Sequence, residues 1–124
     1  MSKPILTIVV PCFNEEEVLK DTIFKLSKVL DELMEEAHVS KESKLLFVDD
    51  GSKDRTWGII EAESENNLFV TGLKLSANMG RQNALIAGLK TANEQSDWVV
   101  SIDADLQDDI NVIRAFIERI LEGV

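Results

Sequence analysis

The stretch "ILTIVVPCFNEE" (residues 5–16) begins with apolar and β-branched residues and turns polar and acidic within a few positions. Its apolar part suits a buried strand and is too short for a membrane span or a signal segment. Runs of the same kind recur along the chain, so strands are expected at residues 5–10, 44–48, 68–75 and 97–102. The opening stretch therefore shows a pattern that repeats, a buried strand followed by polar residues.

The segments between these runs have the spacing of amphipathic helices. Apolar residues recur three and four positions apart between Val18 and Met34, and again between Ile110 and Leu121. The expected element order is β-α-β-α-β-α-β-α. Continuously apolar strands joined by helices form a parallel sheet with right-handed crossovers. The predicted fold class is therefore α/β, a doubly wound, mainly parallel sheet with helices on both faces.

Composition and charge limit the possible partners. The 124 residues suffice for one domain, with 13 Lys and Arg against 23 Asp and Glu and a formal net charge of -10. This excess of negative charge disfavours nucleic acid as a partner. The single cysteine, Cys12, has no partner for an internal disulfide and is expected to pack in the core, as are Trp57 and Trp98. His38 is expected on the surface. These features indicate a cytoplasmic protein.

The second expected strand ends in two adjacent carboxylates, Asp49 and Asp50. One interpretation is a simple turn, with Ser52 or Asp54 capping the following helix. Ligands of doubly wound sheets bind beyond the carboxyl ends of the strands, however, where the strand order reverses. A carboxylate at that position could accept a hydrogen bond from a base or a ribose hydroxyl.

The stretch "DADLQDD" follows the last expected strand. The chain is expected to be extended there, so the side chains of Asp103 and Asp105 should point the same way. Together with the carbonyl oxygen of Gln107, they would offer the oxygen ligands that Mg²⁺ takes. The alternative, a helix N-terminus that attracts negative charge, is accepted for Asp108 and Asp109, which begin the helix.

Two further stretches carry polar groups toward the same sheet edge. In "NMGRQNALIAG", Arg81 opens a helix and could contact a diphosphate. Taken alone, the stretch favours helix capping over a diphosphate contact, and no P-loop is present. After the first strand, Pro11, Phe13, Asn14 and Glu15 could form a wall against which a flat base packs. The next two glutamates are expected only to complement the helix dipole.

Four stretches in this order, "IVVPCFNEEE", "VDDGSKDRT", "NMGRQNALIAGL" and "SIDADLQDD", carry a resemblance to a known family. Together they closely resemble the inverting family 2 glycosyltransferases, which have a GT-A fold. The form of the last two stretches looks most like the branch that transfers a sugar from a nucleotide to a polyprenyl phosphate. Dolichyl-phosphate mannose synthases and bacterial undecaprenyl-phosphate glycosyltransferases belong to that branch. The resemblance extends from about Ile5 to Gly123 and implies the Rossmann-like half of a GT-A fold.

The resemblance also implies roles for residues after the first two strands. Pro11, Phe13 and Glu15 match positions that contact the nucleotide base in family members. Asp50 matches the acid that forms a hydrogen bond with the base, and Asp49 lies beside it. These five residues are the expected nucleoside contacts.

For the diphosphate, the resemblance implies a metal site. Asp103 and Asp105 match the D-x-D motif, and Gln107 matches an additional metal ligand of the polyprenyl branch. Arg81 lies in a loop that family members place near the diphosphate. The implied cofactor is Mg²⁺ or Mn²⁺, which would neutralise the leaving diphosphate while the acceptor phosphate attacks from the opposite face.

Members of the family continue beyond the point that matches residue 124, with acceptor-binding elements and often membrane helices. The resemblance therefore implies that residues 1–124 form the nucleotide-sugar-binding core of a longer enzyme at the cytoplasmic face of the membrane. The catalytic base, if the reaction needs one, is expected beyond this core. The core alone is expected to bind donor and metal with little activity, and it could self-associate through apolar surface.

Two alternatives belong to other functional classes. The first is a nucleotide-binding module without catalysis. The second is a receiver domain, which is also acidic, doubly wound and Mg²⁺-binding. A receiver, however, needs its acidic pair after the first strand and an acceptor aspartate after the third. Here those strands are followed by "PCFNEE" and "SANMG", so the receiver is disfavoured.

Overall fold

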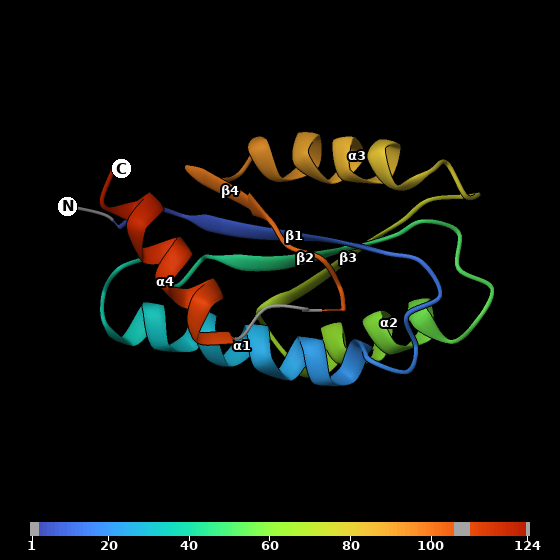
Figure 1. The fold of residues 1–124 in the computed structure, drawn as a ribbon, viewed down its shortest axis with the longest axis horizontal. Helices are drawn as coiled ribbons and strands as arrows, with labels where there is room; N and C mark the ends of the chain where they lie inside the picture. Colours follow the sequence, from blue (N-terminus) through green and yellow to red (C-terminus); the bar gives the residue numbers. More distant parts are fainter. Residues whose placement is uncertain (1–2, 106–109, 124) are drawn as a thin grey trace.

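A computed structural model describes residues 3–105 and 110–123, and its elements alternate as predicted (Figure 1). The strands of the described chain are β1 (Leu6–Cys12), β2 (Lys44–Asp49), β3 (Val70–Lys74) and β4 (Trp98–Ser101). The helices are α1 (Leu19–Glu35), α2 (Thr56–Asn66), α3 (Arg81–Asn93) and α4 (Ile110–Leu121). Within the described ranges, no helix is long and apolar enough to cross a membrane.

The strands form one parallel sheet with the order β3-β2-β1-β4. The first three strands follow one another in one direction, and the fourth returns to the other side of β1. The strand order therefore reverses at β1. In a doubly wound sheet, the carboxyl ends of the strands at such a reversal form the usual ligand crevice.

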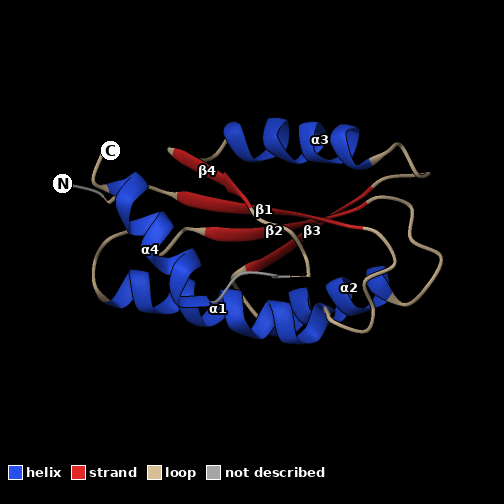
Figure 2. Ribbon diagram, viewed as in Figure 1, coloured by secondary structure: helices blue, strands red, loops and turns tan. Residues whose placement is uncertain are grey.

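Helices cover both faces of the sheet, which confirms the predicted fold class. Figure 2 shows α3 on one face and α1, α2 and α4 on the other. Alternate residues of β1 supply the two cores: Ile8 packs with α1, α2 and α4, whereas Val9 packs under α3. On the α3 side, a Cβ atom at Gly88 would lie 2.6 Å from Val9 Cγ1 and 2.8 Å from Val48 Cγ2. The absence of a side chain at Gly88 thus lets α3 lie close to the sheet.

Several expected boundaries and burials differ in the structure. Pro11 lies within β1 and does not end it, because the strand pairs with β2 as far as Cys12. Helix α1 begins one residue after Val18, whose side chain is exposed. The prediction that Trp98 packs in the core is wrong, because β4 lies at the sheet edge and the residue is 37% exposed. Trp57 does pack against the core.

Candidate active site at the carboxyl edge of the sheet

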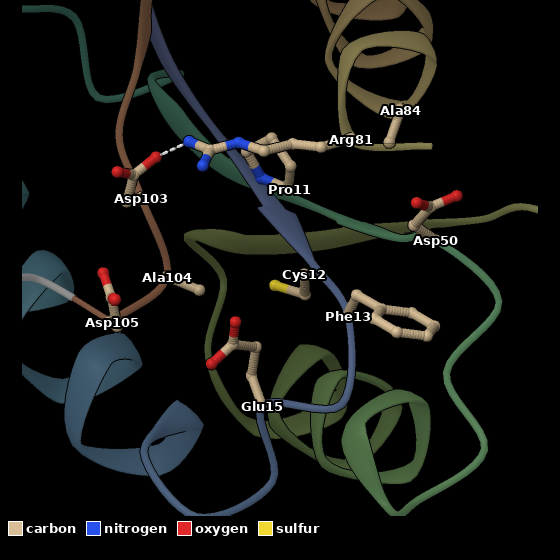
Figure 3. A pocket seen from close by; sticks show the side chains of 10 residues that line it. All are labelled: Pro11, Cys12, Phe13, Glu15, Asp50, Arg81, Ala84, Asp103, Ala104 and Asp105. Atoms are coloured by element: carbon tan, nitrogen blue, oxygen red, sulfur yellow. Dashed lines mark ion pairs between the residues drawn. The ribbon is translucent and has the colours of Figure 1, made fainter. Parts of the chain in front are cut away.

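A pocket of about 290 Å³ opens at the carboxyl ends of the strands, beside the strand-order reversal. Its walls come from the end of β1 and the following loop, the residue after β2, the first turns of α3 and the segment after β4 (Figure 3). The lining residues are Pro11, Cys12, Phe13, Glu15, Asp50, Arg81, Ala84, Asp103, Ala104 and Asp105. Residues nearly 100 positions apart in the sequence thus meet at the predicted edge.

Hydrogen bonds between neighbouring loops hold the β1–α1 wall of this pocket. Ser52 Oγ accepts from the backbone N–H of Asn14 at 2.9 Å, and Asn14 Oδ1 accepts from the backbone N–H of Lys53 at 2.9 Å. Thr56 Oγ1 accepts from the backbone N–H of Glu15 at 2.8 Å. Asn14 has a φ of 52°, a left-handed conformation that asparagine tolerates well. The loop that carries Phe13 and Glu15 is therefore fixed to the loop after β2.

Asp54 precedes α2 and also anchors this wall. The prediction that Ser52 or Asp54 is the N-cap is wrong, because the N-cap position is Arg55, but Asp54 accepts from the first residue of the helix. Its Oδ1 accepts from the backbone N–H and the hydroxyl of Thr56 at 2.9 and 2.6 Å, and its Oδ2 accepts from the backbone N–H of Glu16 at 3.2 Å. Burial raises the pKa of Asp54, but these hydrogen bonds together lower it by more than burial raises it. The pKa of Asp54 therefore lies below its ordinary value. Asp54 is therefore a structural carboxylate.

The two carboxylates at the end of β2 have separate environments. Asp50 lines the pocket, and its Oδ1 accepts from the backbone N–H of Met79 at 2.7 Å. Asp49 is fully buried and does not line the pocket; its Oδ1 accepts from the backbone N–H of Ser52 at 3.2 Å. Within the described residues, Asp49 Oδ2 has no hydrogen-bond partner. The structure thus brings Asp50, and not Asp49, to the predicted site.

Gly51 allows the turn after Asp50 to pack against the loop before α3. Its φ is +72°, a region that L-amino acids with side chains rarely adopt. A Cβ atom there would lie 2.4 Å from the backbone nitrogen of Asn78 and 2.6 Å from the carbonyl carbon of Ala77. The close approach of these two backbone segments places Met79 within reach of Asp50.

Opposite Asp50, the pocket is lined by charged groups of α3 and of the segment after β4. Arg81, the first residue of α3, forms an ion pair with Asp103 across the pocket (Figure 3). The prediction that the D-A-D segment is extended is wrong, because β4 ends at Ser101 and Ala104 and Asp105 lie in a turn. Both aspartates nevertheless line the same pocket.

Glu15 and Cys12 have altered proton affinities. Burial, followed by the negative charges of Asp105 and Asp54, raises the pKa of Glu15, and Arg81 opposes this effect. Burial also raises the pKa of the Cys12 thiol, with Glu15 and Asp49 adding to the shift. Cys12 is therefore a neutral thiol and a poor nucleophile. It lines the pocket, which the sequence reasoning missed although it lies between two predicted contacts.

The oxygen donors of the D-A-D turn suit a hard cation. Asp103 and Asp105 contribute carboxylates to the pocket, and Mg²⁺ commonly binds one or two carboxylates together with substrate phosphates and waters. Within residues 3–105 and 110–123, no group of three or more His, Cys, Asp or Glu side chains is arranged to hold a metal ion. Gln107, the third predicted ligand, lies outside the described residues, as do Asp108 and Asp109.

The sequence model of the family described as "Glycosyl transferase family 2" matches residues 7–124. The chain belongs to glycosyl transferase family 2. This membership, and an acidic pair that lies at the end of β2 and not after β1, exclude the receiver domain.

The chain is similar to several named bacterial and phage proteins. The chain is 61% identical to "Uncharacterized glycosyltransferase YkoT" of Bacillus subtilis (strain 168), over 98% of this chain and 36% of the relative. It is 40% identical to "Bactoprenol glucosyl transferase" of Shigella phage SfV, over 92% of this chain and 34% of the relative. The chain thus spans about a third of the length of the curated relatives it matches.

Solved structures of glycosyltransferases share the fold. Glucosyl-3-phosphoglycerate synthase from Mycobacterium tuberculosis, in complex with UDP, superposes with a TM-score of 0.71 at 22% identity, over 95% of this chain and 40% of that chain. Mannosyltransferase PcManGT from Pyrobaculum calidifontis, in complex with GDP-Man and Mn²⁺, gives 0.68 at 22% identity, over 95% and 32%. These similarities confirm the GT-A type of fold.

Proposed function

We propose that the pocket binds a nucleoside-diphosphate sugar together with a divalent cation. We further propose that the chain is the donor-binding part of an enzyme that transfers the sugar, with inversion, to a polyprenyl phosphate. The observation that carries the proposal is the convergence of Asp50, Arg81, Asp103 and Asp105 on one pocket at the strand-order reversal of a family 2 chain. The two kinds of contact, to a nucleoside and to a diphosphate, come from opposite walls.

The nucleoside side consists of Pro11, Phe13, Glu15 and Asp50. Phe13 is 42% exposed at the pocket, so that its ring and Pro11 offer an apolar surface to a flat base. The Asp50 carboxylate accepts a hydrogen bond from Met79 through one oxygen. A carboxylate has further acceptor capacity, and we assign it to a base N–H. Asp49, buried behind the pocket, contributes through Ser52 and the turn and not through ligand contact.

The diphosphate side consists of Arg81, Asp103 and Asp105. Asp103 and Asp105, with Gln107 as the third proposed ligand, would hold Mg²⁺ or Mn²⁺. When bound, the cation supplies charge neutralisation for the departing diphosphate. The Arg81 guanidinium, now paired with Asp103, lies at the first turn of α3, where backbone N–H groups favour an anion. It would bind the same diphosphate by charge-assisted hydrogen bonds.

The acceptor is assigned from the relatives. Their names include "Bactoprenol glucosyl transferase" and, at 32% identity, "Undecaprenyl-phosphate 4-deoxy-4-formamido-L-arabinose transferase" of Shewanella sediminis. Because such an acceptor is a lipid, we propose that the longer enzyme acts at the cytoplasmic face of a membrane. The oxygen of that phosphate would attack the anomeric carbon from the face opposite the diphosphate, which inverts the centre. The chain's own carboxylates hold the donor and do not attack the sugar.

Titration calorimetry tests this proposal. The chain is titrated with UDP, GDP and their glucose or mannose conjugates, with Mn²⁺, with Mg²⁺ and with EDTA. At least one of these nucleotides should bind more tightly with metal than in EDTA. The corresponding nucleoside, which has no diphosphate, should bind equally well in both conditions. A folded sample that binds none of these nucleotides in the presence of metal would refute the donor site. Donor binding by the full-length enzyme without sugar transfer would favour the non-catalytic module instead.

A further inference from the structure

Thr22, near the start of α1, has a buried hydroxyl that forms a hydrogen bond outside its own helix. Its Oγ1 donates to the carbonyl oxygen of Ala104 over 2.5 Å. The two residues are 2% and 3% exposed. Ala104 is the middle residue of the D-A-D turn, so this bond connects α1 to the backbone between Asp103 and Asp105. The partners lie 82 positions apart in the chain.

The local geometry of α1 does not require this hydroxyl. Helical threonines often donate to the carbonyl four residues earlier, as Thr91 does to Ala87 at 3.0 Å. In α1, the backbone N–H of Thr22 already donates to Val18 at 3.0 Å, so the helical ladder is satisfied by the backbone. The Thr22 hydroxyl therefore serves the turn. Without it, the Ala104 carbonyl would lose its hydrogen bond in a buried place.

This hydrogen bond acts where the sheet no longer sets the backbone. The ladder between β1 and the segment after β4 reaches the backbone N–H of Ile102, which donates to Val9 at 3.0 Å. The peptide plane that contains the Ala104 carbonyl also contains the nitrogen of Asp105. A bond to that carbonyl therefore restricts the rotation of this plane, and with it the direction of the Asp105 side chain relative to Asp103.

We propose that Thr22 is a positioning residue for the diphosphate side of the pocket. Its hydroxyl holds the D-A-D turn in the conformation that directs both carboxylates toward one ligand. The inference rests on the proposed function, because the ligand is the metal-bound diphosphate of the donor. Outer hydrogen bonds that orient metal ligands typically change metal affinity by about 10- to 100-fold.

Substitutions at Thr22 test the binding consequence. Thr22→Val removes the hydroxyl at nearly constant volume, Thr22→Ser keeps it, and Thr91→Val is the matched control in another helix. Thr22→Val should weaken Mn²⁺-dependent UDP binding by about 10- to 100-fold while UDP binding in EDTA is unchanged. Thr22→Ser and Thr91→Val should bind as the unaltered chain does. Thr22→Ala should repeat the result if Thr22→Val does not fold. Unchanged Mn²⁺-dependent binding in a folded hydroxyl-free variant would overturn the proposal.

A ligand-free measurement separates this inference from the proposed function. Amide hydrogen exchange at Ala104 and Asp105, followed by NMR, should be faster in Thr22→Val than in the unaltered chain and should return to normal in Thr22→Ser. Equal exchange in all three proteins would overturn the positioning role. If the unaltered chain binds no UDP with Mn²⁺, the proposed function fails. The exchange rates then still decide whether Thr22 holds the turn.

Discussion

The nucleoside side and the diphosphate side of the pocket are stabilised in different ways. On the nucleoside side, the backbone N–H of Glu15 donates to the Thr56 hydroxyl, and the Asp50 carboxylate accepts from the backbone N–H of Met79. On the diphosphate side, Arg81 and Asp103 are exposed and form an ion pair with each other. Exposed ion pairs contribute little to stability, about 1 kcal/mol or less.

This difference indicates which side chains of the pocket are fixed before the ligand arrives. Hydrogen bonds between loops fix the nucleoside side as part of the fold. The ion pair between Arg81 and Asp103 on the diphosphate side is weak. It can therefore be replaced by contacts of Asp103 to a cation and of Arg81 to a diphosphate. Substitutions on the nucleoside side should therefore affect folding or binding strongly, and substitutions of the exposed charges should affect binding alone.

The largest effect is expected at the turn that supports the nucleoside side. Gly51→Ala places a methyl group against the backbone of Asn78 at a φ of +72°. The strained conformation and the collision together should lower the free energy of unfolding by about 2–4 kcal/mol. Urea unfolding followed by circular dichroism measures this change.

Gly58→Ala is the matched control for Gly51→Ala. Among the described residues, no heavy atom outside its immediate helical surroundings lies within 4 Å of a Cβ at Gly58. Because alanine favours a helix over glycine by about 1 kcal/mol, this variant should be slightly more stable than the unaltered chain. Equal stability of Gly51→Ala and the unaltered chain would show that the backbone approach is not rigid.

The next largest effect is expected for Asp50→Asn, which keeps an oxygen for the Met79 N–H but removes the charge. Hydrogen bonds to charged groups contribute about 1.5–3 kcal/mol, so nucleotide binding should weaken about 10- to 100-fold with little change in stability. Calorimetry with uridine and with UDP measures this loss of affinity, which should be the same for the two ligands. Asp97→Asn is the control, because its carboxylate accepts from the backbone of Ile5 at 2.8 Å, at the start of β4. Unchanged nucleotide affinity in Asp50→Asn would remove Asp50 from the site.

A smaller effect is expected for Arg81→Gln on the diphosphate side. UDP binding should weaken about fivefold, the equivalent of about 1 kcal/mol for an exposed charge contact. Uridine binding should not change, and the loss should shrink as salt is added. Lys90→Gln, near the other end of α3, is the control for net charge. A parallel loss of uridine affinity would place Arg81 on the nucleoside side instead.

The smallest effect is a pH dependence at Glu15. Burial and then Asp105 raise the pKa of Glu15, so the folded state holds this proton to a higher pH than the unfolded chain does. Stability is therefore lost as pH rises from the ordinary carboxyl range through the raised pKa. Glu15→Gln removes this loss, so the variant should gain stability relative to the unaltered chain at about pH 7 and gain none at about pH 3.

Urea unfolding at both pH values measures the Glu15 effect, with Glu65→Gln on the exposed side of α2 as the control for the loss of one negative charge. The stability change of Glu15→Gln at neutral pH is compared with that of Glu65→Gln. A lower stability of Glu15→Gln in this comparison would contradict a raised pKa of Glu15.

The order of the elements could be predicted because it depends on local pattern. Each strand overlaps an expected apolar run, and α1 and α4 begin and end within one residue of the amphipathic stretches that predicted them. The location of the pocket at the carboxyl edge of the sheet could also be predicted, because the carboxyl ends of parallel strands lie at the same edge. The exposure of Trp98 could not be predicted, because it depends on the place of β4 in the strand order.

The candidate site was predicted in part. Seven of its lining residues, Pro11, Phe13, Glu15, Asp50, Arg81, Asp103 and Asp105, were named from motifs. The separation of Asp49 from Asp50 required the orientation of the strand end. The hydrogen bonds that hold the loops, such as Asn14 to Ser52 across 38 positions, join residues with no common local pattern. They become visible only when the strands are paired.

The strand order also has a consequence for how the chain folds. Strand β1 pairs on one side with β2, and the backbone of Leu6 meets Ser43 across 37 positions. On its other side it pairs with β4, and the backbone of Ile5 meets Asp97 across 92 positions. Closing the longer loop costs more chain entropy, which favours early pairing of β1 with β2 and late docking of β4. The pocket needs both pairings, so nucleotide binding should serve as a reporter for the final folding step.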